Sequence, residues 1–343
     1  MITISAAPAL VVCAVLSFAP GTPVGMNNLD AGAAPDAGVD VDAGVSGPGE
    51  VVRLVAAGDV QLGRGIGEAA KACGDPRAPF AAVRDVLSGA DIAVANLESQ
   101  LFPWCRPVAP DSLRLCADPR AVEGLVDAGI DVVSVANNHA LDFGPRALEH
   151  SVRFLRHRGI AVAGPGLRTP VLERGGTRVA FVAFSPVDRI LLPREMAAAV
   201  AAARRRADLV VALVHWGEEY QERPSVRQRR LAGFLAGEGV DLIVGSHPHV
   251  VQPLERERGA IVFYSLGNFV FDQQWSEETS RGALAEVELS GAAGIVRAQL
   301  VRLRLEQPGY PRIQNNTDDL TTDGLMALPD GLTPDGLTDG LTP

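Results

Sequence analysis

The sequence has little lysine, no surplus of positive charge and no long apolar run. Lys71 is the only lysine, and the other 30 basic residues are arginines. With 31 basic and 41 acidic residues the net charge is −10, so the chain lacks the basic excess that a nucleic-acid-binding surface requires. No apolar run approaches the roughly 18 residues of a membrane-spanning helix. We therefore expect no nucleic-acid partner and no clear membrane-spanning helix.

The negative charge lies at the two ends of the chain. Residues 1–50 and 311–343 each carry a net charge of −5, which leaves residues 51–310 neutral. Residues 8–19 are apolar and have the length of a signal-peptide core, although no basic residue precedes them. Asp-Ala-Gly and Asp-Gly-Leu repeats fill much of the two ends, and such compositions cannot bury a core. We predict four parts: a leader (1–20), an acidic linker (21–50), one folded domain (51–310) and a disordered tail (311–343).

A leader followed by a solvated linker is typical of an exported protein. We expect a periplasmic or cell-surface location, with the N-terminal segment as a candidate membrane tether. Cys105 and Cys116 flank a proline-containing stretch that predicts a turn, and an oxidising compartment would let them form a disulfide. We predict this Cys105–Cys116 pair, with Cys73 free. The alternatives are three unpaired thiols, or Cys73 bonded to one of the other two.

The central region alternates between β-branched apolar runs and helix-like segments. Near-continuous apolar runs predict strands buried on both faces. These strands are expected at 51–58, 90–97, 131–137, 178–184, 207–215, 241–246 and 260–266, with two more within 281–306. Helices are expected at 119–128, 145–158, 194–207 and 225–238. The pattern predicts an α/β core with extra sheet at its C-terminal end.

Polar side chains follow nearly every predicted strand at its carboxyl end, where ligands bind in open α/β sheets. They are Asp59, Asn96, Glu98, Asn137, Asn138, His139, His215, His247, His249 and Asn268. Four of the six histidines belong to this set. Carboxylate, amide and imidazole ligands together suit Mn, Fe or Zn. The set predicts a metal site, and the alternative is a coincidence of capping and turn residues.

Six segments, taken as a set and in order, resemble one protein family. They are GDVQLGR (58–64), NLE (96–98), ANNHALDFG (136–144), HWG (215–217), GSHPH (245–249) and SLGNF (265–269). They resemble the capsule or poly-γ-glutamate synthesis protein family, the CapA family, which is related to calcineurin-like metallophosphoesterases. The resemblance covers about residues 51–305. It implies an α/β fold: a four-layer sandwich of two packed mixed sheets flanked by helices.

The resemblance also implies a role for each matching residue. One divalent metal would be held by Asp59, Glu98 and His249, and a second by Glu98, Asn138, His215 and His247. His139 would be the catalytic residue. Substrate contacts or support of the ligands would come from Asn96, Asn137, Asp142, Trp216 and Asn268. Phosphoesterases have a histidine where this chain has Gln61, so we expect the first metal to be held weakly and the second tightly.

Two functions follow from the resemblance. The first is an exported metal-dependent hydrolase of capsule or poly-γ-glutamate synthesis, acting on a phosphoester or a polyglutamate-like anionic substrate. The second is a non-catalytic, tethered component of a surface-polymer assembly complex, with membrane-bound polymer-synthesis proteins as candidate partners. His139 favours the hydrolase, because a scaffold has no need of a residue that is not a ligand. Gln61 favours the scaffold.

Overall fold

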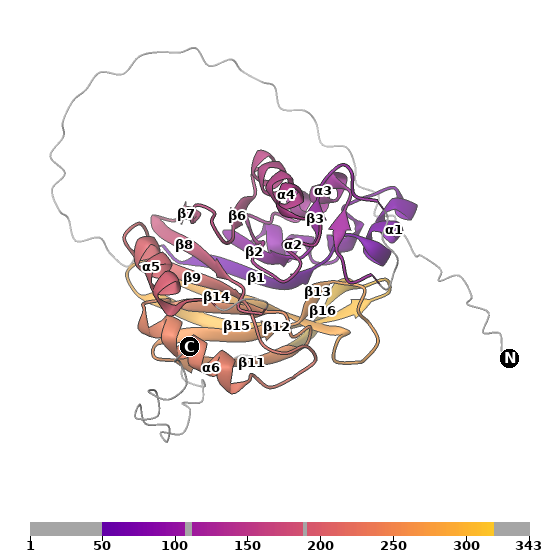
Figure 1. Cartoon of the computed structure of the whole chain (residues 1–343). Coiled ribbons are helices and arrows are strands. Elements are labelled where there is room, and N and C mark those ends of the chain that lie inside the picture. Colours follow the sequence, from indigo (N-terminus) through magenta and orange to yellow (C-terminus); the bar gives the residue numbers. More distant parts are fainter. Residues whose placement is uncertain (1–49, 107–111, 188–190, 319–343) are drawn as a thin grey trace, which may run out of the picture.

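The computed structural model describes residues 50–106, 112–187 and 191–318, which form two packed β-sheets with helices outside them (Figure 1). Eight described strands make the larger sheet, in which β13 pairs with β1 beside the main order. That order is β16 (Tyr310–Asp318), β15 (Gly294–Glu306), β14 (Arg281–Ser290), β1 (Val52–Val60), β2 (Ile92–Leu97), β5 (Val132–Ser134) and β6 (Ala161–Ala163), with β13 spanning Asn268–Val270.

The smaller sheet has six described strands, and a two-stranded sheet stands apart from both. In spatial order the six are β11 (Val251–Glu257), β12 (Ala260–Leu266), β10 (Leu242–Ser246), β9 (Leu209–His215), β8 (Thr177–Phe184) and β7 (Val171–Arg174). The separate pair is β3 (Gln100–Leu101) and β4 (Cys116–Ala117). Both large sheets are mixed, because antiparallel strands flank a parallel centre.

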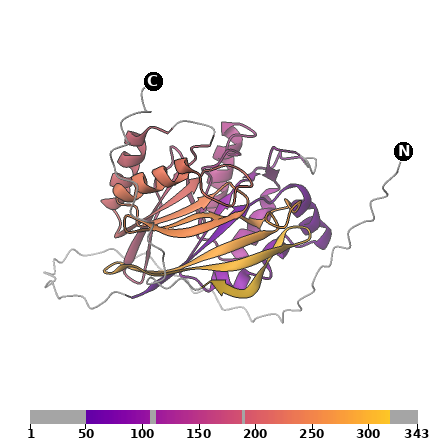
Figure 2. The same ribbon diagram turned by 90° about the horizontal axis from the view of Figure 1, so that it is seen from below.

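Helices cover the outer face of each sheet (Figures 1 and 2). The larger sheet is covered by α1 (Arg64–Cys73), α2 (Arg84–Ser88), α3 (Val122–Asp127) and α4 (Pro145–His157), and the smaller by α5 (Pro193–Arg204) and α6 (Val226–Gly237). Short 3-10 helices span Ala78–Phe80 and Pro119–Ala121. Among the described residues no helix combines the length and apolar character needed to cross a bilayer.

The layering follows from strands that are apolar on both faces. In β1, Leu54 packs into the core between the two sheets, whereas its neighbour Val55 packs against the outer helices. Successive side chains of a strand point to opposite faces, so each buried strand contributes side chains to two cores. Phe181 of β8 lies in the same central core as Leu54. The predicted four-layer sandwich of two mixed sheets is therefore confirmed.

The folded region reaches beyond residue 310, where we expected a disordered tail to begin. Strand β16 pairs antiparallel with β15, and Tyr310 and Ile313 pack against the core beneath the outer helices. Pairing explains the difference, because β15 presents a row of backbone groups that a polar segment can satisfy as well as an apolar one. The predicted leader, the linker up to residue 49 and the tail from residue 319 lie outside the described residues.

Candidate metal centre

The carboxyl ends of parallel strands from both sheets deliver the predicted polar residues to one place. In the larger sheet Asp59 pairs in register with Asn96 on one side and Asn268 on the other. In the smaller sheet His215 ends β9, opposite Ser246 of β10. Because the two sheets pack face to face with these ends together, side chains far apart in sequence meet there.

The first predicted metal group is assembled and buried. Ligand atoms of Asp59, Glu98 and His249 all lie within 4.8 Å of one another. His249 Nδ1 is 3.3 Å from Asp59 Oδ2. All three side chains are almost completely removed from solvent. Two carboxylates this close and this deeply buried repel each other, so the arrangement favours a bound cation.

The pKa values reflect that crowding. Burial and the charge of Asp59 raise the pKa of Glu98 to about 8. Burial would also raise the pKa of Asp59, but its hydrogen bond to His249 and the charges of His249 and His215 lower it to about 2. Burial would lower the pKa of His249, but the hydrogen bond to Asp59 and the charge of Glu98 raise it to about 9. Glu98 Oε2 is buried and has no hydrogen-bond partner among the described residues, so it is an acceptor well suited to a cation.

The second predicted group lies beside the first and shares Glu98 with it. His215 Nε2 is 2.8 Å from Asn138 Oδ1 and 3.9 Å from Glu98 Oε1. The rings of His215 and His247 have centroids 4.7 Å apart. Burial lowers the pKa of His215 well below its usual value, so this imidazole is neutral, the form that binds metals. Carboxylate, amide and imidazole donors therefore converge as the metal hypothesis requires.

The two histidines of the His-Pro-His segment sit on strained backbone. His247 has a φ of 97° and His249 a φ of 57°, in the left-handed region that favours glycine. Such conformations cost about 1–3 kcal/mol each and are concentrated at functional sites. The backbone N–H of His247 donates to Asp59 Oδ2 at 3.2 Å, which helps to hold the turn in place.

Three asparagines contact the candidate ligands or one another. Asn96 Nδ2 donates to Asp59 Oδ1 at 2.8 Å and to Glu98 Oε1 at 3.3 Å. Asn137 Nδ2 donates to Asn96 Oδ1, at 3.2 Å. Asn268 Oδ1 lies 2.9 Å from Nδ1 of His249, leaving the other ring nitrogen for a metal. These contacts orient the side chains of the candidate ligands.

His139 lies at the edge of the cluster. Its Nε2 is 3.8 Å from Glu98 Oε2, and its Nδ1 is 2.9 Å from Asp142 Oδ2. The side chain is 14% exposed, whereas those of Glu98 and His215 are at most 1% exposed. His139 is thus a titratable group next to the ligands that solvent or a substrate can reach.

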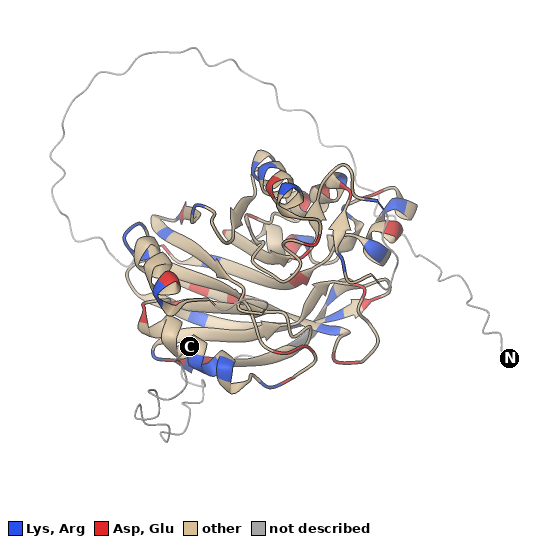
Figure 3. Ribbon diagram, in the orientation of Figure 1, with Lys and Arg blue, Asp and Glu red and all other residues tan. Residues whose placement is uncertain are grey.

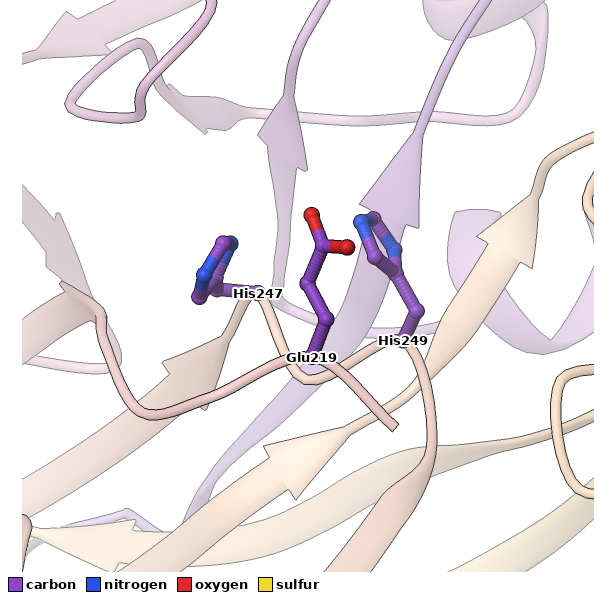
Figure 4. A group of neighbouring side chains, drawn as sticks. All are labelled: Glu219, His247 and His249. Carbon is purple, nitrogen blue, oxygen red and sulfur yellow. The ribbon is translucent and has the colours of Figure 1, made fainter. Parts of the chain in front are cut away.

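Glu219 is a candidate ligand that the sequence analysis missed. One of its carboxylate oxygens lies within 4.8 Å of ligand atoms of both His247 and His249. Figure 4 shows this carboxylate between the two imidazoles. Glu219 is exposed and follows another glutamate, so in sequence the pair is typical of a solvated loop. Its spacing of four residues after His215 was the only available signal.

One predicted detail, the place of Trp216, needs correction. Trp216 does not face the cluster: its Nε1 donates to the backbone oxygen of Tyr264, and its ring packs in the core under α5 and α6. Its neighbour His215 faces the site, and successive residues of an extended chain point to opposite sides. Gln61 is fully buried, and its Nε2 donates to Asp272 Oδ1 at 3.0 Å.

The cysteine prediction is right for one pair and wrong for the third cysteine. Cys105 and Cys116 form the predicted disulfide, with Cα atoms 6.0 Å apart. Cys73, expected to be free, is also disulfide-bonded, and the described residues include no free cysteine. Cys73 ends α1 with a partly exposed side chain, so another thiol can reach it.

Fold and site together define the class: a four-layer α/β sandwich with a candidate metal centre at the carboxyl ends of its strands. The family model for the bacterial capsule synthesis protein PGA_cap matches residues 53–273, which include every residue of the centre. The chain belongs to this family, as the sequence motifs indicated.

Two relatives and one solved structure add detail. The "PGA biosynthesis protein CapA" of Bacillus subtilis is 29% identical over 258 residues, 68% of this chain and 66% of that protein. The "Capsule biosynthesis protein CapA" of Bacillus anthracis is 30% identical over 266 residues, 70% of this chain and 64% of that protein. The chain thus covers just under two thirds of both. A hypothetical protein from Thermus thermophilus superposes with a TM-score of 0.51 at 19% identity, over 74% of this chain and 99% of that one, which supports the fold alone.

Proposed function

We propose that this protein takes part in the synthesis of a capsule or poly-γ-glutamate polymer as a metal-dependent hydrolase, acting on a phosphoester or a polyglutamate-like anionic substrate. Family membership supports the polymer, since curated relatives carry the names of poly-γ-glutamate and capsule biosynthesis proteins. The observation that carries the hydrolase is the buried pair Asp59 and Glu98, surrounded by imidazoles, with His139 beside it.

The donor set fits a divalent transition metal. Asp59, Glu98 and His249 would hold one ion, with Glu219 within reach, and Glu98, Asn138, His215 and His247 would hold the other. Such ions supply Lewis acidity and lower the pKa of a bound water. This mixture of imidazole, carboxylate and amide donors suits Mn, Fe or Zn.

The residues of the chain would supply positioning and proton transfer. Asn96 and Asn268 keep the carboxylate and imidazole donors aligned. His139 is held through Nδ1 by Asp142, so its Nε2 faces the cluster and can give a proton to a leaving oxygen or nitrogen. The limited exposure of His139 is consistent with a group that meets substrate.

The second candidate function is a non-catalytic component of a polymer-assembly complex. Gln61 favours it, because an amide tied to Asp272 replaces the imidazole found in phosphoesterases. For either function we propose export to the periplasm or cell surface, with membrane-bound synthesis proteins as candidate partners. The apolar stretch at 8–19 and the Cys105–Cys116 disulfide support that location.

Turnover by the full chain separates the two functions. Hydrolysis of a chromogenic phosphoester and of poly-γ-glutamate would be measured with added Mn and with EDTA, for the wild type, His139→Ala and a matched control, His157→Ala. His157 is exposed on α4, far from the candidate ligands in sequence. If the protein is a hydrolase, we expect metal-dependent turnover. His139→Ala should abolish that turnover without changing the metal content, and His157→Ala should preserve it. Equal absence of turnover in all three proteins would select the non-catalytic component.

A further inference from the structure

A groove lies close to the candidate metal centre. It has a volume of about 480 Å³ and runs where β11, at the edge of the smaller sheet, meets β14 and β15 of the larger sheet. Its basic lining consists of Arg281, Arg302 and Arg304, and we call it the arginine groove. All three arginines are exposed.

Strand alternation explains why these arginines share a face. Arg302 and Arg304 are two and four residues beyond Leu300, which packs in the core between the sheets. The intervening residues, Val301 and Leu303, pack instead toward the outer helices. The inner face of the larger sheet therefore continues past the end of the central core, and there it carries arginine in place of aliphatic residues. Figure 3 shows basic segments on the strands beside β16.

The strand register places like charges directly opposite one another. Arg304 of β15 pairs with Arg281 of β14 on one side and with Arg312 of β16 on the other. Like charges at directly opposed positions destabilise a sheet. Arg281 and Arg312 have exposed ion-pair partners, Glu277 and Glu306, but Arg304 makes no ion pair with any described residue. Arg304 therefore lacks a counter-charge among the described residues, and an anion that binds across the row would supply one.

The spacing of the row fits a repeating anion. Neighbouring strands lie about 4.8 Å apart, and residues on the same face of one strand are about 6.8 Å apart. Arg281, Arg304 and Arg312 lie on neighbouring strands and so are separated by the first distance. Arg302 and Arg304 lie on the same strand and are separated by the second. Each guanidinium can hold a carboxylate through two parallel hydrogen bonds. Glu222 and Glu278 also line the groove. Their negative charges would repel a compact, highly charged anion, whereas an extended chain can place its carboxylates against the arginines alone.

The groove and the metal centre are built from the same segments. Val250, in the groove lining, directly follows His249. Asn268, the partner of His249, donates from Nδ2 to the backbone oxygen of Thr279 at 3.0 Å, two residues before Arg281. Gly267 forms a β-bridge with Gly282, another lining residue. One end of the groove therefore lies beside His249.

We propose that the arginine groove binds an extended polycarboxylate, of the γ-linked polyglutamate class, and leads it to the metal centre. The identity of the polymer rests on the proposed function, whereas the anion-binding role rests on the row of arginines and the groove. The groove would give the site a preference for long chains over single residues, because successive carboxylates engage successive arginines.

Binding of fluorescently labelled poly-γ-glutamate to the full chain tests the proposal, by anisotropy at low salt and at increasing salt. Arg304→Ala should weaken binding at least tenfold and reduce its salt dependence, with metal content unchanged. Glu222→Gln should strengthen binding, because it removes a like charge from the groove. Arg230→Ala is the matched control: Arg230 is exposed on α6, outside the groove, and should bind as the wild type does.

The outcomes separate this proposal from the proposed function. No polymer binding by the wild type, or equal affinity in Arg304→Ala and the wild type, would overturn the groove even if metal-dependent turnover is present. Binding of duplex DNA of matched length with the same dependence on Arg304 would also overturn it, since the groove would then be a general polyanion surface. Arg304-dependent polymer binding without any turnover would support the proposed binding role of the groove and contradict the proposed hydrolase activity.

Discussion

Asp142 Oδ2 lies 2.9 Å from His139 Nδ1 and also accepts a hydrogen bond from the backbone N–H of Leu115, at 2.7 Å. The main chain therefore fixes the carboxylate of Asp142, and the fixed carboxylate in turn orients the imidazole of His139. A ring held through Nδ1 has its Nε2 directed at one place, here toward Glu98. Asp142 thus contacts His139 and orients its ring.

We expect Asp142→Ala to lower kcat by about ten- to a hundredfold, the usual effect of losing a residue that orients a functional histidine. KM and metal content should stay near the wild-type values, because no candidate ligand is removed. Asp142→Asn should restore part of the loss, since its amide oxygen can still accept from Nδ1. Glu149→Ala, at an exposed position of α4, is the control. A matching fall in metal content would show that Asp142 instead supports the ligands.

The strand-end rule made most of the centre predictable from sequence. Asp59, Glu98 and His215 each end a short apolar run, and parallel strands bring such ends together whatever the loops between them do. Glu219 could not be found this way, because it belongs to a loop whose path depends on the left-handed turn at Tyr220. Trp216 was misplaced because alternation continues one residue past the strand end.

The fold was predictable to a similar depth and for a similar reason. Runs that are apolar on both faces identified the central strands, and Pro145 correctly predicted the first residue of α4. Strand β16 was missed because its sequence, YPRIQNNTD, is mostly polar. Its place depends on backbone pairing with β15, and pairing leaves little trace in hydrophobic periodicity.

Metal content should be unequal between the two positions. The group of Asn138, His215 and His247 offers two imidazoles, whereas the group of Asp59 and His249 offers one. We expect dialysed protein to retain closer to one metal ion per chain than two, measured by elemental analysis. Full occupancy by two ions after mild chelation would contradict this.

Glu219 sharpens that experiment, because its carboxylate can supplement the group that contains His249. On refilling with Mn, Glu219→Gln should bind the weakly held ion, the one at Asp59, Glu98 and His249, about ten- to a hundredfold more weakly than the wild type does, as for loss of a supporting ligand contact. Glu218→Gln is the matched control, one residue earlier in the same loop. Equal refilling of Glu219→Gln and wild type would show that Glu219 remains in solvent.

Gly245 should tolerate no side chain. A Cβ built there would lie 2.0 Å from the backbone oxygen of Tyr264 and 2.5 Å from Trp216 Nε1, so a strand would have to move. We expect Gly245→Ala to lower the free energy of unfolding by about 1–3 kcal/mol or more, as overpacking does. Gly237→Ala, in α6 with 3.4 Å to a flexible arginine tip, should be neutral or slightly stabilising. Urea denaturation of both variants measures the difference.

Removing β16 tests how far the folded region extends. A chain that stops after residue 318 keeps every strand pair described here, and should unfold at the same urea concentration as the full chain. A chain that stops after residue 309 loses the packing of Tyr310 and Ile313 and turns β15 into an unpaired edge. Exposed edges pair with other chains, so this shorter protein should be less stable and prone to aggregate.

Size-exclusion chromatography would measure the aggregation of the two truncated chains, and urea denaturation would measure their stability. Equal behaviour of the two chains would mean that β16 adds nothing to the fold. Because β16 carries Gln314, which lines the arginine groove, and Arg312, which pairs with Arg304, the shorter chain should also bind poly-γ-glutamate more weakly even under conditions where it remains folded.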